Sequence, residues 1–277
     1  MTFDTESNQL EIDDQDARLP PMRSQREIIG RDTRKRRRNT NAYPFRYICQ
    51  LSWPEGLHTM GGSGILVGPR TILTAGHNLV RSDPTPAINR PQDMKIVPGR
   101  DGARKPFGET VGARFILPPG FIRRNASGTI TGFRIATRFD YAIVHLKDPL
   151  GSTAGYWGQS PRPSGDSRGS SITGTLPLPP GRLSVNLSGY PVDKPWGTQW
   201  SAFNRLQQRQ NGLLLYENDT FGGHSGSPVW VTRHSSNGGR NLVGVHIRRF
   251  RVGGRPTFNA AVHLGQKERS FVSRNTR

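Results

Sequence analysis

The chain has 277 residues, a length that fits one large domain or two small ones, and 32% of the residues are hydrophobic. Its 33 glycines and 22 prolines favour many short strands joined by tight turns over long helices, so we expect an all-β protein. The sequence contains no run of about 18 apolar residues, which excludes a membrane-spanning helix and predicts a soluble protein.

The N-terminal region differs in charge from the rest of the chain. Residues 1–27 hold seven acidic residues against three arginines, although the whole chain carries a formal charge of +19. This composition predicts a disordered tail or a removable leader. The region also lacks the apolar run of a secretory signal, which leaves a cytoplasmic location, a trimmed signal or another export route open. The basic body is expected to attract nucleic acid, anionic membranes or acidic polypeptides.

A basic block, 33–38 (TRKRRR), follows the acidic region. Such a run can contact nucleic acid, but a solvated extended arm is the interpretation that we favour. Further along, the single cysteine, Cys49, lies in an apolar run and has no second cysteine to pair with. We therefore expect a buried structural thiol and a fold that depends on its core alone.

Short apolar segments separated by Gly, Pro, Asn and Asp make up most of the remaining chain. Their lengths of about four to eight residues are typical of sandwich or barrel strands. The predicted strands lie within 45–51, 63–67, 94–97, 111–117, 139–146, 183–189, 213–216, 227–232, 242–247 and 258–264. The Gly-, Ser- and Pro-rich stretch 151–170 divides the chain in two, and a helix is expected only around 266–272.

A histidine and a carboxylate stand beside two of these apolar segments. In 71–78 (TILTAGHN), His77 comes just after an apolar strand, where an imidazole can face a cleft. In 139–146 (FDYAIVHL), Asp140 begins a buried strand, where an unpaired charge would be costly, so it needs a partner and His77 is the obvious one. The rival carboxylate, Asp148, lies between Lys147 and Pro149 and reads as part of an exposed turn.

A serine surrounded by glycines precedes another strand, in 222–229 (GGHSGSPV). Acyl transfer requires amide N–H groups aimed at the oxygen that becomes negative, and glycine permits the dihedral angles that turn them inward. The expected donors are the N–H groups of Gly223 and Ser225. Ser225 itself is the candidate nucleophile, which needs a base and a group that orients the base.

These signals occur in the order His, Asp, Ser, and together they predict a serine endopeptidase with His77 as general base, Asp140 as its orienting carboxylate and Ser225 as nucleophile. No metal or organic cofactor is indicated, because the histidines lack ligand spacing and there is no cysteine cluster. The expected partners are polypeptide substrates, acidic ones in particular, and we expect a monomer.

Beyond these motifs, the chain resembles the bacterial glutamyl endopeptidases, which are serine proteases of the chymotrypsin type. The resemblance runs from about residue 28 to residue 264. It rests on the triad motifs and on segments 28–34 (IIGRDTR), 42–46 (AYPFR), 97–102 (VPGRDG), 155–158 (GYWG), 188–194 (SGYPVDK) and 197–200 (GTQW).

The resemblance implies two antiparallel six-stranded β-barrels with the active site between them and a short C-terminal helix. It implies an acidic tail or propeptide over 1–27, a first barrel over 28–155 and a second over 156–277. It also implies cleavage after Glu, less readily after Asp, with Thr220 and His246 in the pocket for the carboxylate. The family's mature N-terminus falls near Glu27 and Ile28, and secretion is the family's location.

Two departures limit what the resemblance implies. His224 stands where the family usually has Asn or Gln and trypsin-like enzymes have Asp, so activation by an inserted amine of the trypsinogen kind is not expected. Arginines at 248, 249 and 251 follow His246 and can reshape the pocket rim or bind another anion. Two alternatives therefore stay open: a protease with a non-acidic preference, and an inactive scaffold whose basic surface binds nucleic acid or anionic membranes.

Overall fold

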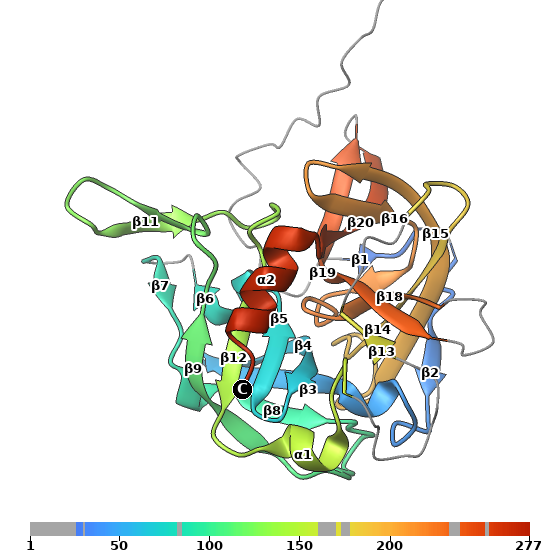
Figure 1. The fold of residues 1–277 in the computed structure, drawn as a ribbon, viewed down its shortest axis with the longest axis horizontal. Coiled ribbons are helices and arrows are strands. Elements are labelled where there is room, and N and C mark those ends of the chain that lie inside the picture. The colour runs from blue at the N-terminus through green and yellow to red at the C-terminus, as the bar shows by residue number, and fades with distance from the viewer. Residues whose placement is uncertain are drawn as a thin grey trace, which may run out of the picture.

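The computed structural model describes residues 26–29, 31–81, 85–159, 170–172, 178–232, 239–252 and 255–277. Six antiparallel strands form a first closed barrel, in the order β12-β5-β4-β3-β8-β9 (Figure 1). Their bounds are β3 (Ile48–Glu55), β4 (His58–Gly68), β5 (Thr71–Thr74), β8 (Lys95–Pro98), β9 (Thr110–Ile116) and β12 (Ala142–Leu146).

A second barrel follows in the sequence. Its strand order is β19-β18-β14-β15-β16-β20, and β19 also pairs with β20, which closes the ring. The bounds are β14 (Ser184–Gly189), β15 (Gln199–Gln210), β16 (Leu213–Tyr216), β18 (Pro228–Thr232), β19 (Arg240–Val252) and β20 (Arg255–His263). The predicted all-β fold of two six-stranded antiparallel barrels is therefore confirmed.

Shorter elements connect or flank the barrels. The strands are β1 (Arg26–Glu27), β2 (Lys35–Arg37), β6 (Val80–Arg81), β7 (Ala87–Ile88), β10 (Ile122–Arg124), β11 (Ile130–Phe133), β13 (Ser170–Ser171) and β17 (Thr220–Phe221). The α-helices are α1 (Leu150–Ala154) and α2 (Gln266–Arg274), so the predicted C-terminal helix is confirmed. The expectation of a helix only at that end is wrong, because α1 forms where Gly151 and Ala154 pack into buried positions. Among the described residues, no helix is long and apolar enough to cross a membrane.

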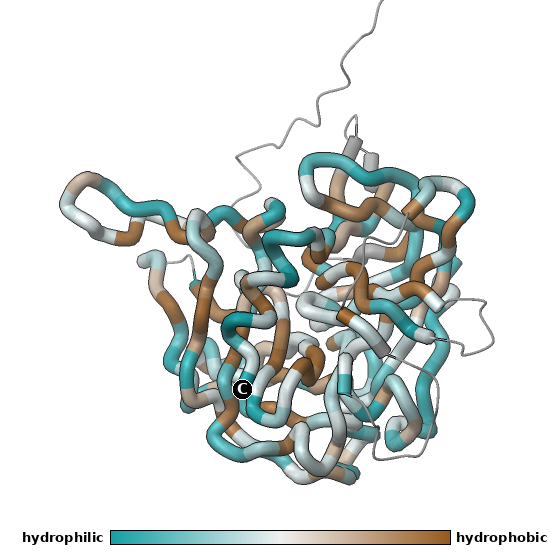
Figure 2. The backbone as a smooth tube through the Cα atoms, in the orientation of Figure 1, coloured by the Kyte–Doolittle hydropathy of each residue, from teal (hydrophilic) through white to brown (hydrophobic). Residues whose placement is uncertain are grey.

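Each barrel encloses an apolar core. Leu51, Ile65 and Ile143 are fully buried in the first barrel, and Leu187 and Val229 in the second. Burying a side chain of this kind contributes about 1.5–3 kcal/mol, so these cores hold the strands in register. Figure 2 shows the hydrophobic segments running through the interiors, with hydrophilic turns outside. Cys49 is fully buried, which raises the pKa of its thiol and confirms the predicted structural cysteine.

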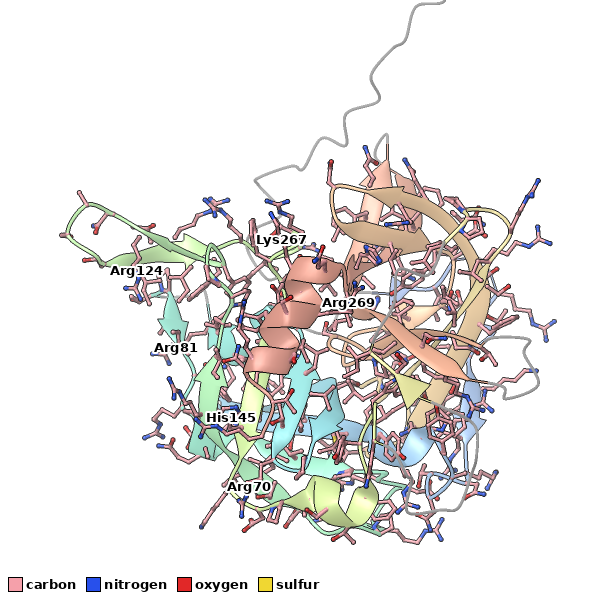
Figure 3. The ribbon with its side chains drawn as sticks, viewed as in Figure 1. Arg70, Arg81, Arg124, His145, Lys267 and Arg269 are labelled. Atoms are coloured by element: carbon pink, nitrogen blue, oxygen red, sulfur yellow. The ribbon has the colours of Figure 1, made fainter. Side chains whose placement is uncertain are left out.

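The two ends of the chain cross between the barrels. β2 lies in the sequence range predicted for the first barrel but pairs with β15 of the second. Helix α2 follows the second barrel but packs on the first. There the rings of Phe271 and Tyr141 are edge-to-face, with their centroids 5.2 Å apart. Near the C-terminus, His145 Nε2 on β12 lies 2.7 Å from the carbonyl oxygen of Asn275 (Figure 3). The domain boundaries at 27/28 and 155/156 stay predictions.

The basic block is only in part the solvated arm that its composition predicts. Arg34 is buried, Arg36 pairs with Asp101 at 2.9 Å, and Arg37 Nε donates to Ser201 Oγ at 2.7 Å. Lys35, Arg36 and Arg38 are exposed, so the arm interpretation is wrong only for Arg34 and Arg37, whose side chains find acceptors on distant parts of the chain.

Candidate active site

His77 and Asp140 meet at one edge of the first barrel. β5 and β12 pair antiparallel with Thr74 opposite Ala142, so the end of β5 and the start of β12 lie together. His77 sits in the 3₁₀ turn that follows β5, and Asp140 comes two residues before β12. The distance between His77 Nδ1 and Asp140 Oδ2 is 2.9 Å. Pairing of the two strands thus brings together residues 63 positions apart.

The carboxylate of Asp140 is buried and fully engaged. It is 0% exposed and accepts hydrogen bonds from the backbone N–H of His77 and of Ala136, each at 2.9 Å, as well as from the imidazole. Burial raises its pKa, but His77 and these hydrogen bonds lower it more, for a net decrease. An ionised carboxylate only accepts, so Nδ1 of His77 donates to it, and in the neutral imidazole Nε2 is then the acceptor.

The rival carboxylate is committed elsewhere. Asp148 Oδ2 accepts a hydrogen bond from Thr110 Oγ1 at 2.7 Å. The backbone N–H of Asp148 in turn donates to Thr110 Oγ1 at 3.1 Å. The structure therefore brings Asp140, and not Asp148, to His77.

The loop that carries Ser225 is tied to the first barrel. The carbonyl oxygen of Ser225 accepts from Ser63 N at 2.8 Å and from Asn78 Nδ2 at 2.9 Å. Asn78 directly follows His77, so the serine loop of the second barrel lies against the turn that holds the imidazole. The hydroxyl of Ser225 donates to the carbonyl oxygen of Ile247 at 3.2 Å rather than to His77.

Two glycines of this loop have backbone conformations that other residues avoid. Gly223 has φ +94°, and a Cβ there would lie 2.4 Å from Tyr190 O; Gly226 has φ +87°, and its Cβ would lie 2.0 Å from Ser63 O. A side chain at either position would have a strained backbone and would clash with a carbonyl oxygen, so both positions require glycine.

Hydrogen bonds to two carbonyl oxygens of the same loop orient the peptides that follow them. Gly222 O accepts from Val192 N at 2.8 Å, and His224 O accepts from Ser227 N at 2.8 Å. The C=O and N–H of a trans peptide point in opposite directions, so the N–H groups of Gly223 and Ser225 point away from those partners. Within the described part of the chain, neither N–H has a backbone acceptor, which leaves both available to a bound oxygen.

Thr220 lies on β17, just before the serine loop, and His246 lies on β19; both are fully buried. His246 exchanges backbone hydrogen bonds with the loop: its N–H donates to Ser227 O at 2.9 Å, and its carbonyl accepts from Gly226 N at 2.8 Å. The hydroxyl of Tyr216 lies 2.7 Å from His246 Nδ1 and so holds the orientation of this imidazole. Tyr216 carried no signal in the sequence beyond its place in an apolar strand.

His224 has an internal role in the loop. Its side chain is fully buried, and Nδ1 accepts from the backbone N–H of Phe221 at 3.2 Å. Burial lowers its pKa well below the ordinary value, and the positive charge of Arg34 and the nearby His246 lower it further. His224 is therefore neutral and closes the turn before Ser225.

The predicted processing junction lies beside the same loop. β1 pairs with β17 so that Glu27 stands opposite Thr220. Beyond the junction, Asp219 accepts from the backbone N–H of Ile29 at 2.9 Å and of Thr33 at 2.8 Å. Ile28 is thus held next to the strand that carries Thr220. Residues 1–25, the rest of the predicted tail, lie outside the described residues.

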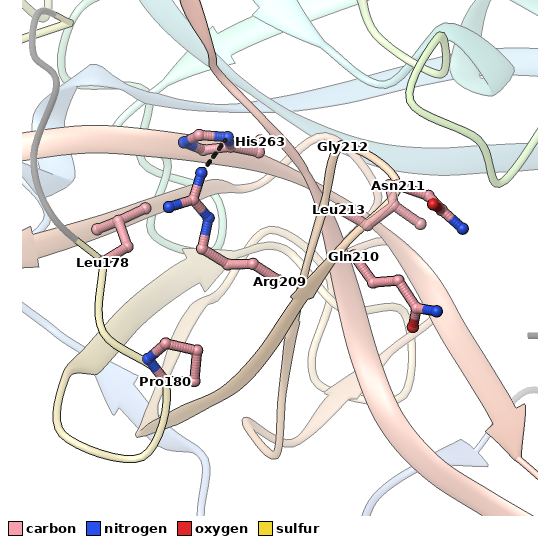
Figure 4. Close-up of a pocket in the computed structure, with 8 residues that line it drawn as sticks. All are labelled: Leu178, Pro180, Arg209, Gln210, Asn211, Gly212, Leu213 and His263. Carbon is pink, nitrogen blue, oxygen red and sulfur yellow. Dashed lines mark hydrogen bonds between the residues drawn. The ribbon is translucent and has the colours of Figure 1, made fainter. Parts of the chain in front are cut away.

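A cavity of about 330 Å³ opens elsewhere on the second barrel (Figure 4). Arg209 and His263 face each other in it, with 3.5 Å between Nη2 and Nδ1. None of the predicted site residues lines this cavity. Within the described ranges, no three His, Cys, Asp or Glu side chains gather in a group that could hold a metal ion.

Comparison with solved structures identifies the fold class. A Glu endopeptidase superposes with a TM-score of 0.68 over 89% of this chain and 98% of that one, at 24% identity. The protease Anisep from Arthrobacter nicotinovorans gives a TM-score of 0.58 over 82% of this chain and 94% of that one, at 18% identity. The protein thus has the chymotrypsin-like double-barrel fold. No family model matches the chain.

Curated relatives narrow the class. A glutamyl endopeptidase of Bacillus licheniformis is 35% identical over 203 residues, which are 73% of this chain and 54% of that protein. An extracellular metalloprotease of Bacillus subtilis is 31% identical over 79% of this chain and 61% of that protein. A glutamyl endopeptidase of Staphylococcus epidermidis is 26% identical over 90% and 74%. The chain is thus a relative of the bacterial glutamyl endopeptidases, as its motifs predict, and it spans just over half the length of the first of them.

Proposed function

We propose that this protein is a serine endopeptidase that forms an acyl-enzyme on Ser225. The observation that carries the proposal is the buried Asp140–His77 pair, 2.9 Å apart, beside a loop that presents a serine and two amide N–H groups. A structural histidine would need neither a buried ionised partner nor a strained glycine loop next to it.

Acylation follows from this geometry. The Ser225 hydroxyl rotates from Ile247 O toward His77 Nε2, which takes its proton as Oγ attacks the substrate carbonyl. Asp140 stabilises the imidazolium that forms. The carbonyl oxygen becomes negative and binds the N–H groups of Gly223 and Ser225, each worth about 10²–10³-fold in kcat.

His77 then returns the proton to the leaving amine, which breaks the peptide bond and leaves an ester on Ser225. Water enters, gives a proton to His77 and attacks the ester through the same oxyanion site. His77 gives that proton to Ser225 Oγ as the ester bond breaks, so the acid product leaves and the hydroxyl of Ser225 is restored.

We further propose a preference for Glu, and to a lesser degree Asp, before the cut bond. If the Tyr216 hydroxyl donates to His246 Nδ1, the other ring nitrogen carries the proton and can donate to a carboxylate. The hydroxyl of Thr220 supplies a second donor. The family resemblance supports this assignment, and a protease with a non-acidic preference is the alternative that the test must separate.

The test combines labelling with cleavage profiling. A fluorophosphonate probe should label the wild-type protein and not Ser225→Ala. A peptide library should show cuts after Glu, and His246→Ala should lose them while the probe still reacts. Labelling of Ser225→Ala at the wild-type rate would exclude the proposed nucleophile, whereas labelled enzyme that cuts only after neutral residues would exclude the pocket assignment.

We also propose that the chain is processed between Glu27 and Ile28, which lie beside the pocket strand, and that the enzyme acts outside the cell, as the name of the Bacillus subtilis relative says of that protein. Intact-mass measurement of active protein should give a chain that begins at Ile28, and Glu27→Gln should block that product. Active enzyme that retains residues 1–27 would contradict the processing.

The rival function is a basic binding protein on an inactive protease scaffold. If it were correct, Ser225→Ala would keep the biological activity, and affinity for nucleic acid would fall steeply with salt. The ion pair of Arg36 and the hydrogen bond of Arg37 disfavour this function, because these side chains are already engaged within the protein.

A further inference from the structure

A guanidinium group is buried next to Phe221, which precedes the serine loop, and the mechanism above gives it no role. The side chain of Arg34 is 0% exposed and forms a forked pair with Asp193, with Nη1–Oδ1 at 3.0 Å and Nη2–Oδ2 at 2.5 Å. Nε and Nη2 also donate to Asp32 at 2.9 Å. Burial lowers the pKa of Arg34, but the hydrogen bonds to both carboxylates raise it more, so the group stays charged.

The ion pairs of Arg34 are connected to the oxyanion hole through the chain segment at Val192 and Asp193. Asp193 follows Val192, whose N–H donates to Gly222 O at 2.8 Å. That hydrogen bond sets the direction of the peptide between Gly222 and Gly223, and thus of the Gly223 N–H. Arg34 also lies over the ring of Phe221, 5.9 Å from its centroid, and Phe221 directly precedes Gly222.

The peptide between Gly222 and Gly223 needs such an anchor. Reversing it changes only ψ of the first residue and φ of the second, and both are glycine, so no Cβ opposes the rotation. A reversed peptide would point a carbonyl oxygen at the developing oxyanion instead of an N–H donor. The hydrogen bond from Val192 N–H to Gly222 O opposes this reversal. It can do so only if the chain segment that carries Val192 is itself held in place.

The chain segment that carries Arg34 is itself fixed. Asp219 is buried and accepts from the backbone N–H of Ile29 and of Thr33, as well as from the Thr33 hydroxyl at 2.6 Å. Residues far apart in the sequence, near 30, 193 and 222, thus meet around one guanidinium. A carboxylate before the nucleophile is absent, since His224 occupies that position.

We propose that Arg34 is a positioning residue for the oxyanion hole: through Asp193 it holds the Val192 N–H against Gly222 O and keeps the Gly223 N–H turned toward the reacting carbonyl. The inference rests on the proposed serine protease function. It assigns to an internal arginine the task of ordering the loop.

The test is Arg34→Met, with Arg36→Met as the matched control. Arg36 is the neighbouring arginine of β2 and pairs with Asp101, away from the serine loop. We expect Arg34→Met to lower kcat by ~10²–10³-fold, the effect of losing one oxyanion donor, with little change in KM. Arg34→Lys, which keeps the charge but not the fork, should recover part of the loss. Arg36→Met should leave kcat unchanged.

A pair of ligands separates positioning from general damage. A peptide aldehyde ending in Glu places a hemiacetal oxygen in the oxyanion hole, whereas the same peptide ending in an alcohol does not. Arg34→Met should weaken binding of the aldehyde by a factor close to the loss in kcat and leave binding of the alcohol unchanged. Equal weakening of both ligands, or an unchanged kcat, would overturn the proposal.

If Arg34→Met does not fold, Asp193→Asn is the second variant, because it keeps the size and one acceptor. It should lower kcat and aldehyde affinity together, and its effect and that of Arg34→Lys should not add in the double variant. Full additivity would overturn the proposal. Failure of the wild-type protein to react with a fluorophosphonate would instead refute the proposed function, so the two failures are distinguishable.

Discussion

Replacing Asp140 with Asn tests the role of the buried carboxylate. Oδ2 accepts from His77 Nδ1 and Ala136 N, and Oδ1 accepts from His77 N, all at 2.9 Å. An amide has one oxygen, so one –NH₂ must face a backbone N–H in either orientation. If the –NH₂ takes the Oδ2 position, it donates to Nδ1, moves the imidazole proton to Nε2 and leaves no acceptor for the serine hydroxyl.

The magnitude follows from these contacts. In either orientation the imidazolium loses its charged partner, and an equivalent change in a Ser-His-Asp triad lowers kcat by about 10⁴-fold. At about 1.36 kcal/mol per factor of ten, that is roughly 5 kcal/mol of transition-state stabilisation. One donor left facing another in a buried site should also lower the free energy of unfolding by about 1–3 kcal/mol.

The assay is kcat on a chromogenic peptide ending in Glu, with urea unfolding as the check on stability. Asp148→Asn is the matched control, because this carboxylate is exposed and bonds Thr110 instead of His77. It should leave kcat unchanged. If Asp140→Asn keeps kcat within about tenfold of wild type while remaining folded, Asp140 does not orient the base.

Three further predictions concern the loop around the serine. The folded-state pKa of His224 is well below its ordinary value of about 6.5, so unfolding takes up a proton and stability should fall as pH drops below 6.5; urea midpoints measured against pH should flatten in His224→Gln. Gly226→Ala combines φ +87° with a Cβ 2.0 Å from a carbonyl oxygen and should cost more than about 3 kcal/mol by thermal melting, whereas Gly102→Ala, at φ +64° with open space, should cost about 1. Asn78→Ala removes the donor to Ser225 O and should destabilise by about 1–3 kcal/mol while lowering kcat, and an unchanged melting temperature would show that this bond between the barrels is dispensable.

The sequence identified elements whose signal is local. The apolar segments at 213–216 and 183–189 match β16 and β14 within a residue, because short β-rich runs between turn residues specify strands by themselves. The motifs around His77 and Asp140 were also sufficient to choose the pair, since a carboxylate at the start of a buried strand requires a partner. Even the preference for Asp140 over Asp148 came from the immediate neighbours of each.

Strand β15 is an element that the local sequence does not predict. It spans Gln199–Gln210, but it is largely polar, and no strand was predicted there. Its hydrogen bonds go to β14 and β16, the strands before and after it in the sequence, and to β2 from the N-terminal part of the chain, so pairing with these strands decides its conformation. Strand propensity depends on such neighbours more than on the residues of the strand itself.

Composition and motif order by themselves determined the all-β class, the short C-terminal helix and the candidate residues at 77, 140 and 225. Only the tertiary structure decided what the arginine at 34 does: in the sequence it belongs to a basic run that reads as solvated, and in the fold it is buried between two carboxylates. The physical reason is that a charge can be buried only where its counter-charges converge: Asp32 is a sequence neighbour of Arg34, but only the fold brings Asp193 to the same guanidinium.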